Sequence, residues 1–202
     1  MIEPLKKITR EQKSQQTKSL ILASVKELLI SNGINSLTTH NICLHANISN
    51  GVFFHFFKSK TQLVIEFLHL DYEEYQHTHP FDVGHKTFSE NIISIYLHNI
   101  AYCKSIGIEF IKIYYSISNK ALLTFSPKTE NITPFTSAIL NQIQIATESG
   151  ELREVADHFT LLNDLSLIVK GCIFEWAISD GEYPIEKQIS RIISIYLRNY
   201  LN

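Results

Sequence analysis

The stretch that decides the fold lies at residues 46–63 and reads ANISNGVFFHFFKSKTQL. Asn47 tolerates the left-handed backbone conformation that a tight turn requires, and Ser49 is a favourable N-cap for a helix of about two turns that runs through Phe56. An earlier N-cap, Thr38, begins another short helix. Two short capped helices around a turn predict a helix-turn-helix, whose second helix enters the major groove of DNA.

Helical periodicity extends on both sides of this stretch. The first helix is expected from Glu11 to about Asn32, with Gly33 ending it, and Ser59 caps a further helix that begins at Lys60. Later breaks and caps predict a connection at 75–85, apolar stripes at 92–100 and 108–115 separated by Gly107, a loop at 119–132, and helices from Thr133 to Gly150, at 157–179 and at 184–201. Seven glycines and five prolines are too few for a sandwich or barrel, so we expect an all-α fold of about nine helices.

The composition excludes several classes of protein. With 45% apolar and 19% charged residues, the chain falls in the range of globular domains rather than of disordered segments. No apolar run reaches the roughly 18 residues of a membrane span, and no apolar signal core follows the N-terminal lysines. Cys43, Cys103 and Cys172 are spaced too widely for a metal knuckle or a disulfide framework. We therefore expect a cytoplasmic protein with reduced core thiols and no membrane association.

The net charge of −2 divides unevenly along the chain. Residues 1–60 hold eight basic and three acidic side chains, a balance of +5, whereas the other 142 residues hold ten basic and 17 acidic ones, a balance of −7. A basic segment on an acidic body predicts that only the N-terminal part binds a polyanion such as DNA. The same asymmetry also arises by chance in a short chain, so charge alone leaves both interpretations open.

Residues 46–63 resemble the signature of the tetracycline-repressor (TetR) family, commonly written A-G-V-S-K-G-T-L-Y-H-Y-F-x-S-K-E-x-L. Gly33 and Thr38 also fall where that family has glycine and threonine. The resemblance implies an all-α, homodimeric transcription regulator, with a tail and DNA-binding domain at 1–58 and an effector-binding and dimerisation domain at 59–202. It further implies repression at a near-palindromic, double-stranded DNA operator and release by a small-molecule effector, without a cofactor.

Carried over position by position, the resemblance implies a set of DNA-contacting residues. They are Thr38, His40, Ser49, Asn50, Gly51, Val52, His55 and Lys60. Thr38 and Ser49 would cap their helices and direct N–H groups at phosphates, although capping alone also explains both residues. Asn50 can form paired hydrogen bonds with adenine or reach a phosphate, and Lys60 is the expected phosphate clamp. His55 contacts the sugar–phosphate backbone or only solvent.

Four positions depart from the family signature. Phe54 and Phe56 stand where a tyrosine or histidine usually bonds to phosphate, so they keep the packing and lose the hydrogen bond. Asn47 replaces the usual turn glycine, at a modest cost in a left-handed turn. Lys58 replaces a frequent proline and adds a charge beside Lys60. A basic tail either follows the DNA or is simply solvated, and its residues are Lys6, Lys7, Arg10 and Lys13.

The C-terminal body is rich in aromatic residues at helical spacing. Each of these residues alone is more typical of a core than of a ligand contact. Together, in a chain that resembles this family, they imply a pocket for an apolar or aromatic effector. Its candidate lining residues are Tyr96, His98, Phe110, Tyr114 and Trp176.

The segment 157–179 is apolar on nearly every side, which is typical of a helix buried on two faces. We interpret the second covering surface as another copy of the chain. The candidate dimer-interface residues are Leu161, Leu165, Ile168, Cys172, Ile189, Ile193 and Leu197.

The competing hypothesis is a metal-binding helical enzyme or metal sensor. Its candidate ligands lie within 17 positions, and they are His69, His77, His79, Asp82 and His85. His77 and His79 are not a helical i, i+4 pair, and neither a Cys-x-x-Cys nor a His-Glu-x-x-His motif accompanies them. We therefore expect neither a metal site nor catalysis. A ligand-free architectural DNA binder is disfavoured as well, because it would require a more basic body.

Overall fold

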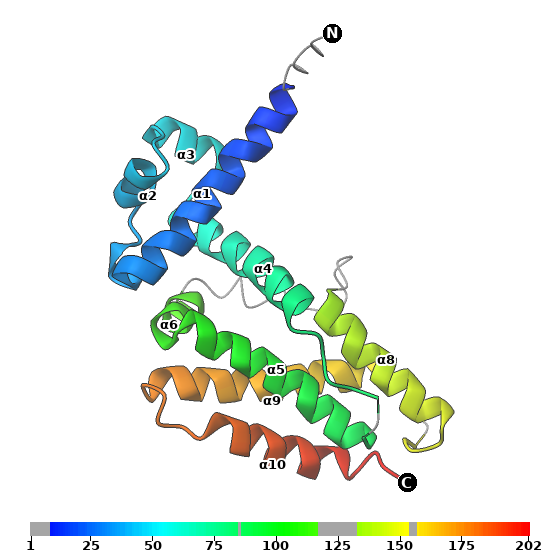
Figure 1. Ribbon diagram of the computed structural model, residues 1–202. Coiled ribbons are helices and arrows are strands. Elements are labelled where there is room, and N and C mark those ends of the chain that lie inside the picture. The colour runs from blue at the N-terminus through cyan, green and yellow to red at the C-terminus, as the bar shows by residue number, and fades with distance from the viewer. Residues whose placement is uncertain (1–8, 85, 117–132, 154–156) are drawn as a thin grey trace. The chain divides into compact units, whose positions relative to one another are not determined.

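A computed structural model describes residues 9–84, 86–116, 133–153 and 157–202, and this part of the chain is helical (Figure 1). The elements are α1 (Arg10–Asn32), a 3₁₀ turn (Ile34–Ser36), α2 (Thr39–His45), α3 (Asn50–Phe56), α4 (Lys60–Thr78), α5 (Phe88–Ile106), α6 (Ile108–Ser116), α8 (Pro134–Glu148), α9 (His158–Ile178) and α10 (Ile185–Leu197). The expected all-α fold is confirmed, with nine α-helices in the described residues. The loop predicted at 119–132 lies outside them.

The chain divides into two compact units, Met1–Leu70 and Asp71–Asn202. The division falls within α4, whereas the boundary predicted between residues 58 and 59 lies just before that helix. A boundary drawn by function and one drawn by compactness need not coincide, so the predicted domains stay a prediction. Within the described ranges, no helix combines the length and the apolar character needed to cross a membrane.

The first unit is organised around α1, which has strong signals at both ends. Thr9 and Gln12 form a capping box, and Gly33, with a φ of 68°, ends the helix and donates its N–H to the Leu29 carbonyl at 3.1 Å. Buried apolar residues of α1 to α4 then form the core of this unit, among them Ile21, Val25, Leu28, Leu37, Ile42, Phe53, Phe57, Leu63 and Val64. The helix-turn-helix is therefore held in place by the apolar core of its own unit.

The second unit is a bundle in which α5, α8, α9 and α10 pack on one another and α6 packs on α5 and α9. Figure 1 shows α5, α9 and α10 side by side. Their inward residues join into one core, to which α9 contributes Leu161, Leu165, Val169, Cys172 and Trp176. The most apolar of the described helices thus lies against the core of its own unit.

Two element boundaries differ from the predicted ones. α4 continues to Thr78, so the connection to α5 begins at His79, four residues later than expected. α10 ends at Leu197, because the end of the chain forms an antiparallel bridge between Leu201 and Leu152 instead of a further helical turn. Such a long-range backbone pairing leaves no mark in the local periodicity.

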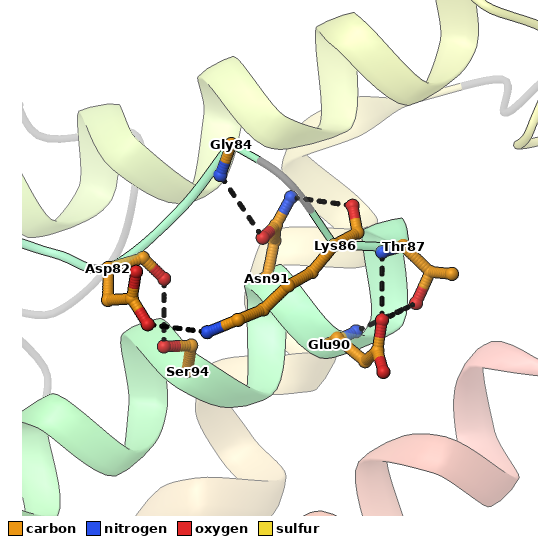
Figure 2. A network of polar contacts seen from close by, with 7 residues as sticks. All are labelled: Asp82, Gly84, Lys86, Thr87, Glu90, Asn91 and Ser94. Atoms are coloured by element: carbon orange, nitrogen blue, oxygen red, sulfur yellow. Dashed lines mark hydrogen bonds and ion pairs between the residues drawn. The ribbon is translucent and has the colours of Figure 1, made fainter.

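A polar network holds the connection before α5 against the first turns of that helix (Figure 2). The buried side chain of Asn91 accepts a hydrogen bond from the Gly84 N–H at 3.4 Å and donates one to the Lys86 carbonyl at 3.2 Å. The Lys86 ammonium bonds to the Asp82 carboxylate at 2.5 Å, and Ser94 donates to the Asp82 carbonyl at 3.0 Å. The path of the chain into α5 is therefore specified by side chains of α5 itself.

Candidate nucleic-acid interface

The turn between α2 and α3 is closed by backbone geometry and by packing. Asn47 has a φ of 50°, which confirms the left-handed conformation predicted for it. The Ile48 N–H donates to the Cys43 carbonyl at 2.9 Å, and Ile42 and Phe53, one from each helix, are completely buried. These contacts fix α3 on α2. A fixed angle between the two helices is what a recognition helix needs in order to enter a DNA groove.

The two predicted caps are present. The Thr38 hydroxyl accepts a hydrogen bond from the Asn41 N–H at 3.1 Å, and the Ser49 hydroxyl accepts one from the Val52 N–H at 3.2 Å. Both cap residues are exposed, as is His40 on the first turn of α2. The capping roles are confirmed, whereas contact of these residues with phosphate stays a prediction.

The exposed face of α3 consists of Asn50, Gly51, Phe54 and His55. A Cβ added at Gly51 would meet the Ser49 hydroxyl at 3.7 Å, with nothing else within 4 Å among the described residues. The backbone of α3 is therefore open to close approach at this point. Val52 is half-buried, so it presents less surface for the base contact predicted for it than Asn50 and Gly51 do.

Two lysines flank the start of α4. The Gln62 N–H donates to the Ser59 hydroxyl at 3.1 Å, and the Gln62 side chain accepts from the Lys58 N–H at 2.9 Å. This reciprocal cap holds the exposed Lys58 just before the helix and the half-buried Lys60 in its first turn. A positive charge in the first turn of a helix is unfavourable to the helix dipole, so Lys60 does not stabilise α4 at this position. Contact with a DNA phosphate would explain why a lysine stands there. Of the basic tail, Arg10 and Lys13 are exposed on α1, while Lys6 and Lys7 lie outside the described residues.

The two phenylalanines that depart from the family signature have different surroundings. Phe54 is 54% exposed and its ring meets that of Phe53 edge-on, with centroids 5.3 Å apart. Phe56 is half-buried, with its ring 5.1 Å from that of His55. Phe54 therefore has exposed ring surface that another molecule can contact, whereas Phe56 serves partly as packing.

The residues expected to line an effector pocket lie in several places in the second unit. Tyr96 is buried, with its ring 5.4 Å from that of Phe135. His98 is 5.0 Å from the ring of Tyr75 and 4.7 Å from that of Phe81, which in turn contacts Phe135. Phe110 and Tyr114 belong to α6, and Trp176 belongs to α9. Their common role as a pocket lining stays a prediction.

Sequence reasoning singled out His98 but missed the cluster of aromatic rings at the end of α4 to which it belongs. Its members are Tyr72, Tyr75, His79, Phe81, His98, Tyr102 and Phe135. Tyr72, Tyr75 and His79 follow Leu68 at spacings of four, three and four residues, so continuing the helical stripe of α4 past Leu68 would have found them. The cluster packs the end of α4 and the start of the following connection against α5 and the first turn of α8.

His98 is the polar centre of this aromatic cluster. Its Nε2 lies 2.6 Å from the His79 carbonyl, and since a carbonyl only accepts, this nitrogen carries the proton. The other nitrogen, Nδ1, is buried with no hydrogen-bond partner in the described residues. Burial lowers the pKa of His98, which favours the neutral ring.

The metal hypothesis gains no support from the described residues, which contain no group of three or more side chains able to hold a metal ion. His69 and His77 are exposed on α4. The His79 ring stacks on that of Tyr75 at 4.2 Å. His85 lies outside the described residues.

Six of the seven residues assigned to the dimer interface lie in the core of the chain's own second unit, and Ile168 is half-buried beside that core. Large apolar residues that stay exposed on the same two helices are Phe159, Leu167, Phe174, Ile178 and Ile195. A partner helix could contact these side chains without disturbing the core. Pairing through α9 and α10 stays a prediction, with the exposed residues as its candidate contacts.

Comparison with known proteins finds one family. The sequence model described as bacterial regulatory proteins of the tetR family matches residues 21–67, which include the helix-turn-helix. No curated protein has a sequence that matches the chain.

Several solved structures share the fold over nearly the whole chain. FadR of Thermus thermophilus, a TetR family transcriptional repressor, has a TM-score of 0.69 at 15% identity and covers 92% of this chain and 95% of its own. A TetR transcription regulator of Haloarcula marismortui has a TM-score of 0.61 at 14% identity, with coverage of 93% and 100%. One of Agrobacterium tumefaciens has a TM-score of 0.58 at 12% identity, with coverage of 92% and 95%. These likenesses show the fold of both units.

Proposed function

We propose that the chain is a DNA-binding transcriptional regulator of the TetR family, whose sequence model matches residues 21–67, and that it acts as a cytoplasmic, homodimeric repressor of a near-palindromic operator. A small apolar or aromatic effector releases the repressor from this operator. The observation that carries the proposal is the exposed face of α3, with Asn50 beside the open backbone at Gly51, held on α2 by the turn at Asn47.

A near-palindromic operator follows from a two-fold dimer. Two copies of α3 related by a two-fold axis contact half-sites that are about one helical turn apart, or a multiple of it. The exposed apolar residues of α9 and α10, with Leu167 65% exposed, support pairing of these helices with a second copy.

Release by an effector requires a ligand that binds the free conformation better than the DNA-bound one. The aromatic cluster supports an apolar or aromatic ligand, because its rings provide apolar faces around the half-buried imidazole of His98. Two proteins of similar fold were solved with small molecules, FadR with lauroyl-CoA and a regulator of Saccharomonospora viridis with choline.

Selection of bound duplexes from a random pool tests the proposal. The expected result is enrichment of an inverted repeat by the wild-type chain and its loss with Asn50→Ala. Repeating the selection with apolar and aromatic ligands tests release, since an effector lowers the recovery of the enriched duplex. Failure to enrich any sequence would contradict sequence-specific binding, and enrichment of an unrepeated site would contradict the dimeric operator.

A further inference from the structure

The exposed face of α3 carries one large apolar side chain, Phe54. It lies one helical turn after Asn50 and Gly51, so it stands between them on the face that would enter a groove. The ring of Phe53, completely buried, supports it edge-on at 5.3 Å. Phe54 is therefore a fixed apolar projection at the centre of the proposed reading surface.

The chemistry of this side chain restricts what it can contact on DNA. Phenylalanine has no donor or acceptor, so it forms no conventional hydrogen bond with a phosphate oxygen. Covering the polar edge of a G·C pair with the ring would remove hydrogen-bonding groups from water without replacing their bonds, at a cost in free energy. The apolar group that base edges present in the major groove is the C5 methyl of thymine.

We propose that Phe54 is a specificity-determining residue that recognises the C5 methyl group of a thymine in the major groove. The inference rests on the proposed function, in which α3 enters that groove beside the operator bases. Four residues of helix advance about 6 Å, which is less than two base-pair steps of about 3.4 Å. The selected thymine thus lies within two steps of the base that Asn50 contacts.

Leu44 provides a matched comparison within the same motif. It is 72% exposed, more than Phe54, but it belongs to α2, the helix that crosses the DNA backbone in this motif. If exposure of an apolar side chain alone caused a preference for thymine, both residues would contribute. If the preference for thymine instead depends on position on α3, only Phe54 contributes to it.

The experiment uses the duplex enriched by the wild-type chain, with each thymine replaced in turn by deoxyuridine, which removes only the methyl group. We expect wild-type affinity to fall about fourfold at one or two positions in each half-site, the value of one buried methyl group. Phe54→Ala lowers affinity for the thymine duplex and abolishes the discrimination at those positions. Phe54→Tyr keeps the ring and the discrimination, and Leu44→Ala leaves the discrimination unchanged.

Each contrary outcome has a distinct meaning. Equal affinity for thymine and deoxyuridine at every position overturns the inference, and so does a discrimination that persists in Phe54→Ala. A wild-type chain that enriches no duplex contradicts the proposed function as well. Circular dichroism and thermal melting of the variants establish that α3 is still folded, because Phe54 is not part of the buried core.

Discussion

The side-chain amide of Asn91 donates a hydrogen bond to Oε1 of Gln142 at 2.9 Å, and both side chains are buried between α5 and α8. The two residues are 51 positions apart in the sequence. A buried amide without a partner lowers stability, so this pair favours one alignment of α5 on α8 over its alternatives. The same Asn91 side chain also holds the connection before α5.

Replacing Asn91 by alanine should lower the free energy of unfolding by about 1–3 kcal/mol, because Oε1 of Gln142 then stays buried without its donor. Urea denaturation measures the change. Asn141→Ala, on the exposed side of α8, is the control and should change stability by less than about 0.5 kcal/mol. In Asn91→Leu with Gln142→Leu, the loss should be smaller than the sum of the two single losses, and simple additivity would contradict the coupling.

Asn47 holds a left-handed conformation, with a φ of 50°. Asn47→Ala should therefore lower the free energy of unfolding by about 1 kcal/mol, whereas Asn47→Gly should change it by less than about 0.5 kcal/mol. Thermal and urea unfolding of both variants provide the test. If the alanine variant is as stable as the glycine variant, the left-handed backbone at position 47 does not cost alanine the expected free energy, and the prediction is wrong.

Lys60 should act on DNA through charge alone. Lys60→Ala is expected to weaken binding to operator and random duplexes by a similar factor and to reduce the slope of log affinity against log salt by about one unit. Titrations at several salt concentrations measure the slope. Lys187→Ala, an exposed lysine of α10, is the control and should leave the slope unchanged. A loss confined to the operator would instead assign Lys60 a role in base recognition.

His98 should make stability depend on pH. Burial lowers its pKa in the folded chain, so the unfolded chain binds a proton first, near pH 6.5, as the pH falls. Stability from this group is therefore present above about pH 6.5 and is lost as the pH falls through that value. Melting temperatures between pH 7.5 and 5.5 should fall less in His98→Gln than in the wild type. His69→Gln, on the exposed face of α4, should follow the wild type, and identical profiles for all three proteins would contradict the prediction.

Local signals predicted the DNA-binding motif well. The hydroxyls of Thr38 and Ser49 accept hydrogen bonds from N–H groups three residues later, and Asn47 adopts its left-handed conformation locally. These roles can therefore be predicted from adjacent sequence. The candidate pocket was harder to predict for a reason of geometry. Tyr96 and His98 are two residues apart on α5, hence about 200° apart around the helix, and they cannot line one face.

The buried and exposed sides of α9 could not be distinguished by residue type. Leu165 is fully buried, while Leu167, two positions later, is 65% exposed. Which of these leucines meets the core depends on where α8 and α10 pack on α9, and that is decided by residues far away in the sequence. A helix that is apolar all round therefore predicts two covering surfaces without showing which one belongs to its own chain.

This distinction gives a direct test of the dimer. Leu167→Asp should convert a dimer into a folded monomer in sedimentation at micromolar concentration, because a charge at an apolar interface is desolvated without a partner. Ile145→Asp, at an apolar position of α8 that is 49% exposed, is the control and should stay dimeric. Leu165→Ala should instead lower the free energy of unfolding by about 2–5 kcal/mol, as a core cavity does. A wild-type monomer, or a dimer unaffected by Leu167→Asp, would show that the exposed face of α9 is not where two copies meet.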